Sequence, residues 1–164
     1  MKPKPISPGD GQESVWDYPR PPRLESCDKR IRIVFNDVVI ADTKAAYRVL
    51  ETSHPPTYYI PPDDVLKECY FRDNGSSLCE WKGQATYYTI VVDSKRAVRV
   101  AWAYHNPMGE FRPIQNHFAV YAHAMDACYC DGELVVPQPG HFYGGWITKD
   151  IVGPFKGEPG SWHW

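Results

Sequence analysis

The sequence lacks long hydrophobic runs and an excess of charge of either sign. No stretch of about 18 apolar residues is present to form a membrane-spanning helix, and the start, MKPKPISPGD, has the lysines of a signal peptide without its apolar segment. The net charge of -2 comes from 18 Lys and Arg against 20 Asp and Glu, and no basic stripe could neutralise a phosphate backbone. We therefore expect a cytoplasmic protein that binds neither membranes nor nucleic acid.

Cysteines are few, and their spacing matches no disulfide framework. Their number is odd, and they stand at Cys27, Cys69, Cys79, Cys128 and Cys130. This pattern is typical of free thiols in a reducing compartment. We expect no structural disulfide.

The familiar phosphate-binding motifs are also absent. There is no G-x-x-x-x-G-K-[ST] and no G-x-G-x-x-G before a helix. A Gly-Ser pair followed by two alternating acids would suggest metal-dependent nucleotidyl transfer, because two Mg²⁺ ions need converging carboxylates. After Gly75-Ser76 the stretch ATYYTIVVD offers only Asp93. The sequence therefore predicts no cofactor.

Proline, glycine and aromatic residues are abundant instead. The 164 residues include 16 prolines, 12 glycines and 14% aromatics. Pro and Gly separate short segments, whereas Tyr and Trp favour strands over helices, and the length suits a single core. The composition predicts a mainly β fold, a single compact domain of mostly antiparallel strands (a complex β-fold) with one or two short helical turns.

Three parts are distinguishable along the chain. Residues 1–14 contain three prolines and no apolar periodicity, and we interpret them as a mobile leader. Residues 15–130 would form the β-domain. Residues 131–164 would be an extension rich in glycine, proline and aromatics, packed on the same domain.

Alternation of apolar side chains is clearest in RIRIVFNDVVIADT, which predicts strands at 30–35 and 38–41 around a turn at its Asn-Asp pair. Residues 43–51 favour a strand because polar and apolar residues alternate there, although a capped helix stays open. Short helical turns are expected in PPDDVLKECY and GEFRPIQNHF. Further strands are predicted at 68–72, 86–92, 96–104, 117–121, 126–130 and 133–136.

A metal site is the first chemistry to weigh. Cys128 and Cys130 lie close in sequence to His117, His123 and His141. On a strand the two thiols would point to the same face, but zinc knuckles usually space their cysteines two to four apart and come in pairs. Structural cysteines and half-buried histidines are the favoured interpretation. We predict no metal site.

Thiol chemistry is the second candidate. Cys79 stands three residues before Lys82, and a nearby ammonium would lower the pKa of the thiol and raise its reactivity. The alternative, which we favour, makes Cys79 a small core residue beside Trp81, with Lys82-Gly83 in a turn.

The stretch ETSHPPTYYIP combines polar side chains with a rigid backbone. If strands flank it at 47–51 and 57–60, Glu51 and Ser53 share one face, while Tyr58 and Tyr59 point to opposite faces. Pro55 and Pro56 fix φ, and they would hold His54 and Ser53 in a defined orientation. The stretch is either a rigid corner or one wall of a ligand site.

Several segments resemble the bacterial family catalogued as domain of unknown function 427. They are VWDYPRPPRLE, VVIADT, RVLETSHPPTYYIPPDDV, CEWKGQATYY, AWAYHNP and FAVY, from about Val15 to Tyr121. The resemblance implies a small, mostly antiparallel β-fold with no established activity. A nucleotidyltransferase-like label is sometimes attached to this family, but its acidic pair is missing here. The tail after Cys130 resembles an extension in a longer branch of the family. The characteristic polar positions of the family fall on Glu51, Ser53, Tyr59, Cys79 and Lys82.

These observations lead to a hypothesis of a polar pocket around Glu51 and Lys82 for an unknown small molecule. Glu51 would be a general base or ligand anchor, Lys82 would hold an anionic group, and Cys79 is the third catalytic candidate. The expected ligand-binding residues are Ser53, His54, Tyr59, Trp81 and Trp102.

The second hypothesis is an interaction or homo-oligomerisation module. It would use the aromatic rings of the tail, because exposed aromatic side chains are frequent anchors of interfaces. The simpler alternative is that the same rings cover the sheet of their own domain. The rings are Phe142, Tyr143, Trp146, Phe155, Trp162 and Trp164.

Overall fold

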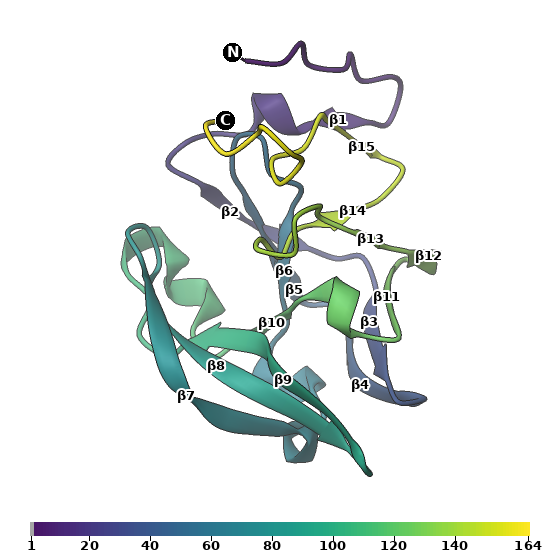
Figure 1. Ribbon diagram of the computed structural model, residues 1–164, viewed down its shortest axis with the longest axis vertical. Helices are drawn as coiled ribbons and strands as arrows, with labels where there is room; N and C mark the ends of the chain where they lie inside the picture. The colour runs from purple at the N-terminus through teal and green to yellow at the C-terminus, as the bar shows by residue number, and fades with distance from the viewer. Residues whose placement is uncertain (1) are drawn as a thin grey trace.

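The computed structural model describes residues 2–164 and consists of short strands and 3-10 turns (Figure 1). Its sheets are mostly antiparallel, which confirms the predicted mainly β fold. One four-stranded sheet has the order β10-β9-β8-β7, a second has the order β12-β11-β3-β4, and a three-stranded sheet has the order β2-β5-β6. The pairs β1-β15 and β13-β14 complete the structure.

The strand bounds are as follows. They are β1 Glu13–Ser14, β2 Arg23–Cys27, β3 Ile31–Phe35, β4 Val38–Thr43, β5 Ala46–Leu50, β6 Thr57–Tyr59, β7 Tyr70–Cys79, β8 Gly83–Val92, β9 Lys95–Tyr104, β10 Phe118–Val120, β11 Ala127–Cys130, β12 Glu133–Leu134, β13 Val136–Pro137, β14 Trp146–Ile147 and β15 Ile151–Val152. The 3-10 turns are η1 Val15–Asp17, η2 Pro62–Asp64, η3 Lys67–Cys69, η4 Gly109–Ile114 and η5 Ala122–Ala124.

The hairpin of β3 and β4 forms where alternation predicts it. Its connection uses Asn36 and Asp37 at φ of 50° and 64°, and these residue types tolerate the left-handed region. Residues 46–50 form a strand rather than a helix, because β5 pairs with β2 on one side and β6 on the other. The two predicted helical turns are present as η2 and η4.

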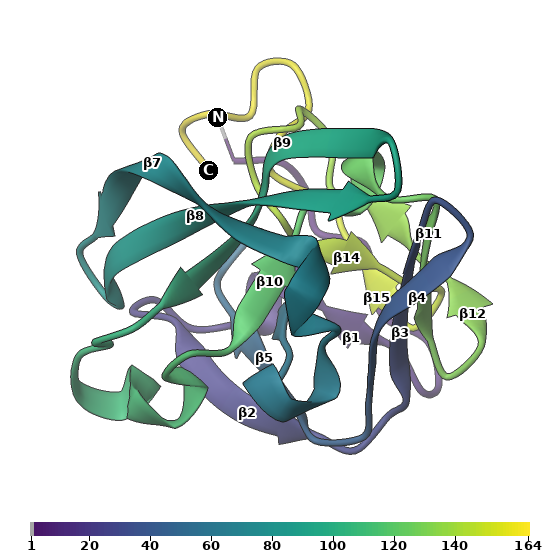
Figure 2. The same cartoon turned by 90° about the horizontal axis from the view of Figure 1, so that it is seen from below.

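Two of the sheets continue into one another where β6 meets β10. The main chains of Ile60 and Phe118 exchange two hydrogen bonds of 2.8 and 2.9 Å, from each N–H to the other carbonyl. Strands in the spatial order β2-β5-β6-β10-β9-β8-β7 therefore make one curved surface. Figure 2 shows the β7-β8-β9 part on one side of the molecule and the β3-β4-β11 sheet on the other.

This curved surface buries a different set of side chains on each face. On β6, Tyr58 belongs to the main core and Tyr59 to a second cluster on the opposite face. On β9, Ala101 faces the main core, whereas Trp102 belongs to the second cluster. Alternation along each strand is the reason, since successive side chains point to opposite faces.

The main core fills the space between the curved surface and the β3-β4-β11 sheet. Cys128 and Cys130 both point into it from β11, and burial raises the pKa of both thiols. Trp146 packs on the ring of Tyr58 with centroids 5.0 Å apart. All five cysteines are free thiols.

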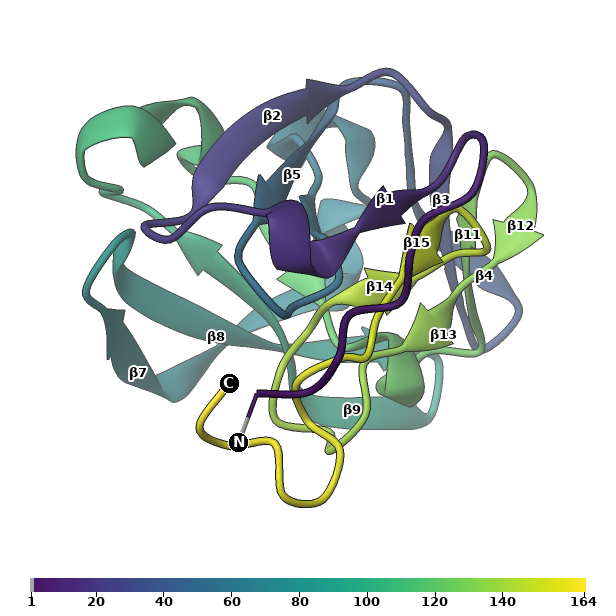
Figure 3. The same cartoon turned by 90° about the horizontal axis from the view of Figure 1, so that it is seen from above.

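The two ends of the chain meet on one side of the molecule (Figure 3). Strand β1 pairs in parallel with β15, and the N–H of Ile6 donates to the carbonyl of Gly153 at 2.9 Å. The rings of Trp16 and Trp164 lie 5.6 Å apart. Within residues 2–164, no helix has the length and apolar character needed to cross a bilayer.

Candidate functional site

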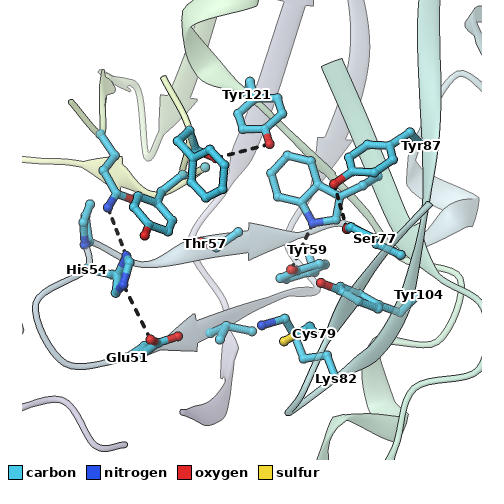
Figure 4. A pocket seen from close by; sticks show the side chains of 18 of the residues that line it. Glu51, His54, Thr57, Tyr59, Ser77, Cys79, Lys82, Tyr87, Tyr104 and Tyr121 are labelled. Carbon is cyan, nitrogen blue, oxygen red and sulfur yellow. Dashed lines mark hydrogen bonds and ion pairs between the residues drawn. The ribbon is translucent and has the colours of Figure 1, made fainter. Parts of the chain in front are cut away.

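The second cluster does not fill its side of the curved surface, and a cavity of about 440 Å³ remains (Figure 4). Strands β5 and β6 form one wall, and the strands and turn of the β7-β8 hairpin, together with β9, form another. The C-terminal segment crosses over it between Gln138 and Gly144, with Lys156 beside it. Side chains from distant parts of the chain therefore share one space.

Six of the eight site residues predicted from the sequence line this cavity. They are Glu51, His54, Tyr59, Cys79, Lys82 and Trp102. The wall does not include Ser53 or Trp81. Ser53 is 0% exposed at φ 72°, because its N–H donates to the carbonyl of Val15 and its carbonyl accepts from the N–H of Lys156. Trp81 packs on the second cluster from the β7-β8 turn.

The floor of the cavity is aromatic. The indole Nε1 of Trp102 donates to the phenol of Tyr59 at 3.2 Å, so both buried polar atoms have a partner. Burial raises the pKa of Tyr59, which keeps the phenol neutral. Tyr87 exchanges a 2.8 Å hydrogen bond with Ser77, and Tyr121 packs on Trp102 with ring centroids 4.7 Å apart.

Lys82 places a cation in these aromatic surroundings. The residue is 9% exposed, and within residues 2–164 no carboxylate lies within 4.0 Å of its ammonium. Its Nζ lies 5.8 Å from the ring centre of Tyr104 and 5.7 Å from that of Phe111. Burial lowers the pKa of Lys82, but the nearby Tyr59 and Cys79, together with the charge of Glu51, raise it above its ordinary value. The ammonium is therefore charged at neutral pH.

Glu51 and His54 form the polar end of the cavity. The carboxylate Oε2 of Glu51 lies 3.5 Å from Nε2 of His54 and 3.3 Å from the guanidinium of Arg20. The other ring nitrogen of His54, Nδ1, lies 3.0 Å from the amide nitrogen of Gln138. Figure 4 shows the contacts from Glu51 through His54 toward the C-terminal segment as dashed lines. The predicted corner and the predicted site wall are thus the same structure.

The amide of Gln138 decides which nitrogen of His54 carries the proton. Its Nε2 also donates to the carbonyl of Lys156 at 2.9 Å, and its Oε1 accepts from the N–H of Gly145 at 3.0 Å. A flipped amide would set donor against donor and acceptor against acceptor at both backbone groups. Gln138 therefore presents N–H to His54, and His54 holds its own proton on Nε2, facing Glu51.

His54 is kept neutral in this position. Burial, the largest influence, lowers the pKa of His54 from 6.5 to about 4, although the carboxylate of Glu51 opposes the shift. Protonation would also place an N–H on Nδ1 against the amide N–H of Gln138. At neutral pH Nδ1 therefore accepts from Gln138, and Nε2 carries the proton 3.5 Å from the carboxylate of Glu51.

Glycines let the C-terminal segment lie close to the other walls. A Cβ on Gly144 would stand 2.3 Å from Cη2 of Trp102, and a Cβ on Gly145 would stand 2.5 Å from the carbonyl oxygen of Pro55. Both approaches are closer than any side chain allows. The segment thus completes the cavity because these two positions lack a side chain.

The histidines and cysteines weighed as metal ligands do not converge. Cys128 and Cys130 lie in the main core, and His117 packs on the ring of Tyr47 at 5.8 Å. His123 stacks on His141 with ring centroids 4.3 Å apart. Residues 2–164 contain no group of three or more His, Cys, Asp or Glu side chains arranged to hold a metal ion.

Most aromatic side chains of the tail pack on their own chain. Trp146 is buried, Tyr143 lines the cavity, Phe155 packs on the small cluster around Val15, and Trp164 packs edge-to-face on Trp16. The exposed rings of this set are Phe142, 66% exposed, and Trp162, 57% exposed.

Comparison with known proteins gives one result. The family model described as a domain of unknown function, DUF427, matches residues 23–131, about two thirds of the chain. No curated protein matches the sequence. The matched region carries Glu51, His54, Tyr59 and Lys82, whereas Gln138 and the rest of the C-terminal wall lie beyond it.

Proposed function

The chain belongs to the DUF427 family, a domain of unknown function, and on the chemistry of its cavity we propose that it binds a small organic anion with a flat, apolar body. Lys82 would hold the anionic group. The aromatic walls would hold the body, and Glu51 with His54 would face its other end. The observation that carries this proposal is the buried ammonium of Lys82, which has no carboxylate partner.

A buried charge without a counter-ion is unfavourable, because the charge loses its hydration. Lys82 is 9% exposed, and ring faces, the thiol of Cys79 and phenols surround it, while the charge of Glu51 acts on it from beyond 4.0 Å. An anion from outside the chain would supply the missing charge, and a charge-assisted contact in such surroundings is stronger than in water. We therefore assign the anionic end of the ligand to Lys82.

The walls support a flat apolar body. Tyr59, Trp102 and Tyr121 present rings from three different strands or turns, and Tyr143 adds another from the C-terminal segment. A cavity of about 440 Å³ is within the usual range for small-molecule sites of about 300 to 1,000 Å³. Aromatic side chains are suited to such a body because they offer large apolar faces at little cost in side-chain entropy.

The same cavity offers groups for chemistry. If the anion is a substrate, Glu51 is the base at one end, and the thiol of Cys79 is the nucleophile beside Lys82. Binding is the simpler function, and it is the one that the unpaired cation supports.

Nucleotidyl transfer finds little support in these residues. The cavity has one carboxylate, Glu51, and that carboxylate is engaged by Arg20 and His54. Asp93 lies in the turn between β8 and β9, outside the cavity wall. A pair of Mg²⁺ ions needs several converging carboxylates, so the donor set does not fit them.

An interaction module remains the alternative from a different class. Its support is the exposure of Phe142 and Trp162, whose rings lie 6.3 Å apart. Phe142 also lines the cavity, so its ring serves equally as part of the rim. We also propose a cytoplasmic location, because five free thiols suit a reducing compartment.

Phenylacetate and its neutral amide, phenylacetamide, test the proposal. We expect phenylacetate to quench Trp fluorescence on binding, and the amide to bind at least about tenfold more weakly because it lacks the charge. Lys82→Met should remove the preference for the acid, whereas Lys67→Met, at an exposed lysine on η3, should keep it. Equal affinity for acid and amide, or full affinity in Lys82→Met, would overturn the proposal.

A further inference from the structure

We infer that the ligand carries a hydroxyl group at the end opposite its anionic group, and that Glu51 accepts a hydrogen bond from it. The inference rests on the proposed function and narrows its ligand to hydroxyl-bearing organic anions. Three features of the cavity carry it: an unused oxygen of Glu51, a histidine with no free acceptor nitrogen, and the separation of Glu51 from Lys82 by more than 4.0 Å.

The unused oxygen is Oε1 of Glu51. Both contacts of this carboxylate, from His54 and from Arg20, are made at Oε2. Within residues 2–164, no side chain or main-chain group donates a hydrogen bond to Oε1. The Glu51 side chain is one quarter exposed and lines the cavity. A carboxylate oxygen in such a place accepts hydrogen bonds and donates none, so the matching ligand group is a donor.

His54 does not compete for that role. Its Nδ1 accepts from Gln138, and its Nε2 carries the proton and lies 3.5 Å from Oε2 of Glu51, so His54 offers a ligand no hydrogen-bond acceptor. Gln138 is 2% exposed and has three hydrogen bonds of 3.0 Å or less, which fix its orientation. The ligand hydroxyl therefore meets Glu51, and His54 and Gln138 hold the Glu51 side chain in place.

The ligand group that donates to Glu51 is expected to be a neutral hydroxyl and not a cationic ammonium. The guanidinium of Arg20, 3.3 Å from Glu51, already balances the charge of this carboxylate. The ammonium groups of Lys82 and Lys156 also line the cavity, and both lower the pKa of His54 by their charge. An additional ammonium on the ligand would enter a positive environment, whereas a hydroxyl adds a donor without charge.

The two anchors stand at different parts of the cavity. Glu51 follows β5, whereas Lys82 lies in the turn between β7 and β8. Figure 4 shows Glu51 to the left of Lys82, with the ring of Tyr59 above Lys82. A ligand that reaches both anchors has its anionic group and its hydroxyl at opposite ends of an aromatic ring.

Three acids on one scaffold test the inference by isothermal titration calorimetry. They are 4-hydroxyphenylacetate, phenylacetate without the hydroxyl, and 4-methoxyphenylacetate, whose ether oxygen accepts but cannot donate. We expect the hydroxyl acid to bind the wild type about tenfold or more tightly than either of the other two, because its donor meets a charged acceptor.

Variants at Glu51 show whether that residue accepts the hydrogen bond from the ligand hydroxyl. In Glu51→Gln the amide oxygen can face His54, which leaves an NH₂ group that cannot accept, and Glu51→Leu removes both oxygens. Both should lose the preference for 4-hydroxyphenylacetate over phenylacetate. Glu68→Gln, on exposed η3, should keep it.

The outcomes separate the two proposals. If all three acids bind the wild type equally, or if Glu51→Leu keeps a tenfold preference, the hydroxyl inference is wrong while anion binding stands. If none of the acids binds at millimolar concentration, both proposals are overturned. If either Glu51 variant fails to fold, the methoxy acid against the hydroxyl acid in the wild type still decides.

Discussion

Arg48 and Lys82 are two cations with the same exposure, 9%, and opposite surroundings. The guanidinium of Arg48 donates to both oxygens of Glu13 at 2.9 and 2.8 Å and to Glu25 at 2.9 Å. The ammonium of Lys82 has no carboxylate within 4.0 Å among residues 2–164. One cation is neutralised by its own chain, and the other is not.

The difference in pairing distinguishes a cation that stabilises the fold from one that is available to a ligand. A buried cation that is paired by two carboxylates joins parts of the fold, here β1, β2 and β5. A buried cation that is left unpaired has a free-energy cost that folding alone does not offset. We interpret the unpaired one as held for a ligand, and each prediction below tests one side of this contrast.

Removal of the paired cation should give the largest effect. Arg48→Met leaves Glu13 and Glu25 without a counter-charge, and we expect a loss of about 3 kcal/mol in the free energy of unfolding, at the low end for buried pairs because both carboxylates keep contact with water. Urea unfolding measures it. A loss below about 1 kcal/mol would mean that the pairing contributes little and that the contrast with Lys82 is not real.

The neutral state of buried His54 should make the free energy of unfolding depend on pH. The pKa of His54 is about 4 when folded and about 6.5 when unfolded, so between these values only the unfolded chain binds the proton. The contribution of His54 is present above pH 6.5 and is lost as the pH falls toward 4. From pH 7 to pH 5 we expect the wild type to lose about 2 kcal/mol more than His54→Gln. Equal losses would show that His54 is not buried as a neutral group.

A side chain at Gly144 should disturb the cavity without touching the Arg48 network. In Gly144→Ala the new Cβ meets the ring of Trp102, so we expect a loss of at least about 1 kcal/mol and weaker binding of phenylacetate. Gly9→Ala is the matched control, since its Cβ would meet only the side-chain oxygen of Gln12 at 3.3 Å. Unchanged binding in Gly144→Ala would place the ligand away from this wall.

Local pattern predicted much of this architecture. Alternation and the Asn-Asp turn gave β3 and β4 nearly at their bounds, and alternation required Tyr58 and Tyr59 to face apart. Which of them faces the cavity depends on the partner sheet, and a period of two carries no information about that. A strand was predicted only over 68–72, but β7 runs on to Cys79 across a register shift between Arg72 and Ser76.

The site was predictable only in part, and for the same reason. Glu51, Tyr59, Cys79 and Lys82 came from segments that resemble the family. Gln138, which fixes the proton of His54, lies 84 residues away from it in sequence and has no local pattern that marks it. Contacts of this range arise only when the C-terminal segment returns over the cavity.

The free energy of unfolding of Lys82→Met, without ligand, tests the central claim most directly. If the cation is unpaired in the fold, an apolar side chain of similar length removes an uncompensated charge, and stability should stay within about 0.5 kcal/mol of the wild type or rise. Lys67→Met gives the baseline for an exposed lysine. A loss above about 1 kcal/mol would show that the chain itself satisfies Lys82, and would contradict the assignment of this residue to a ligand.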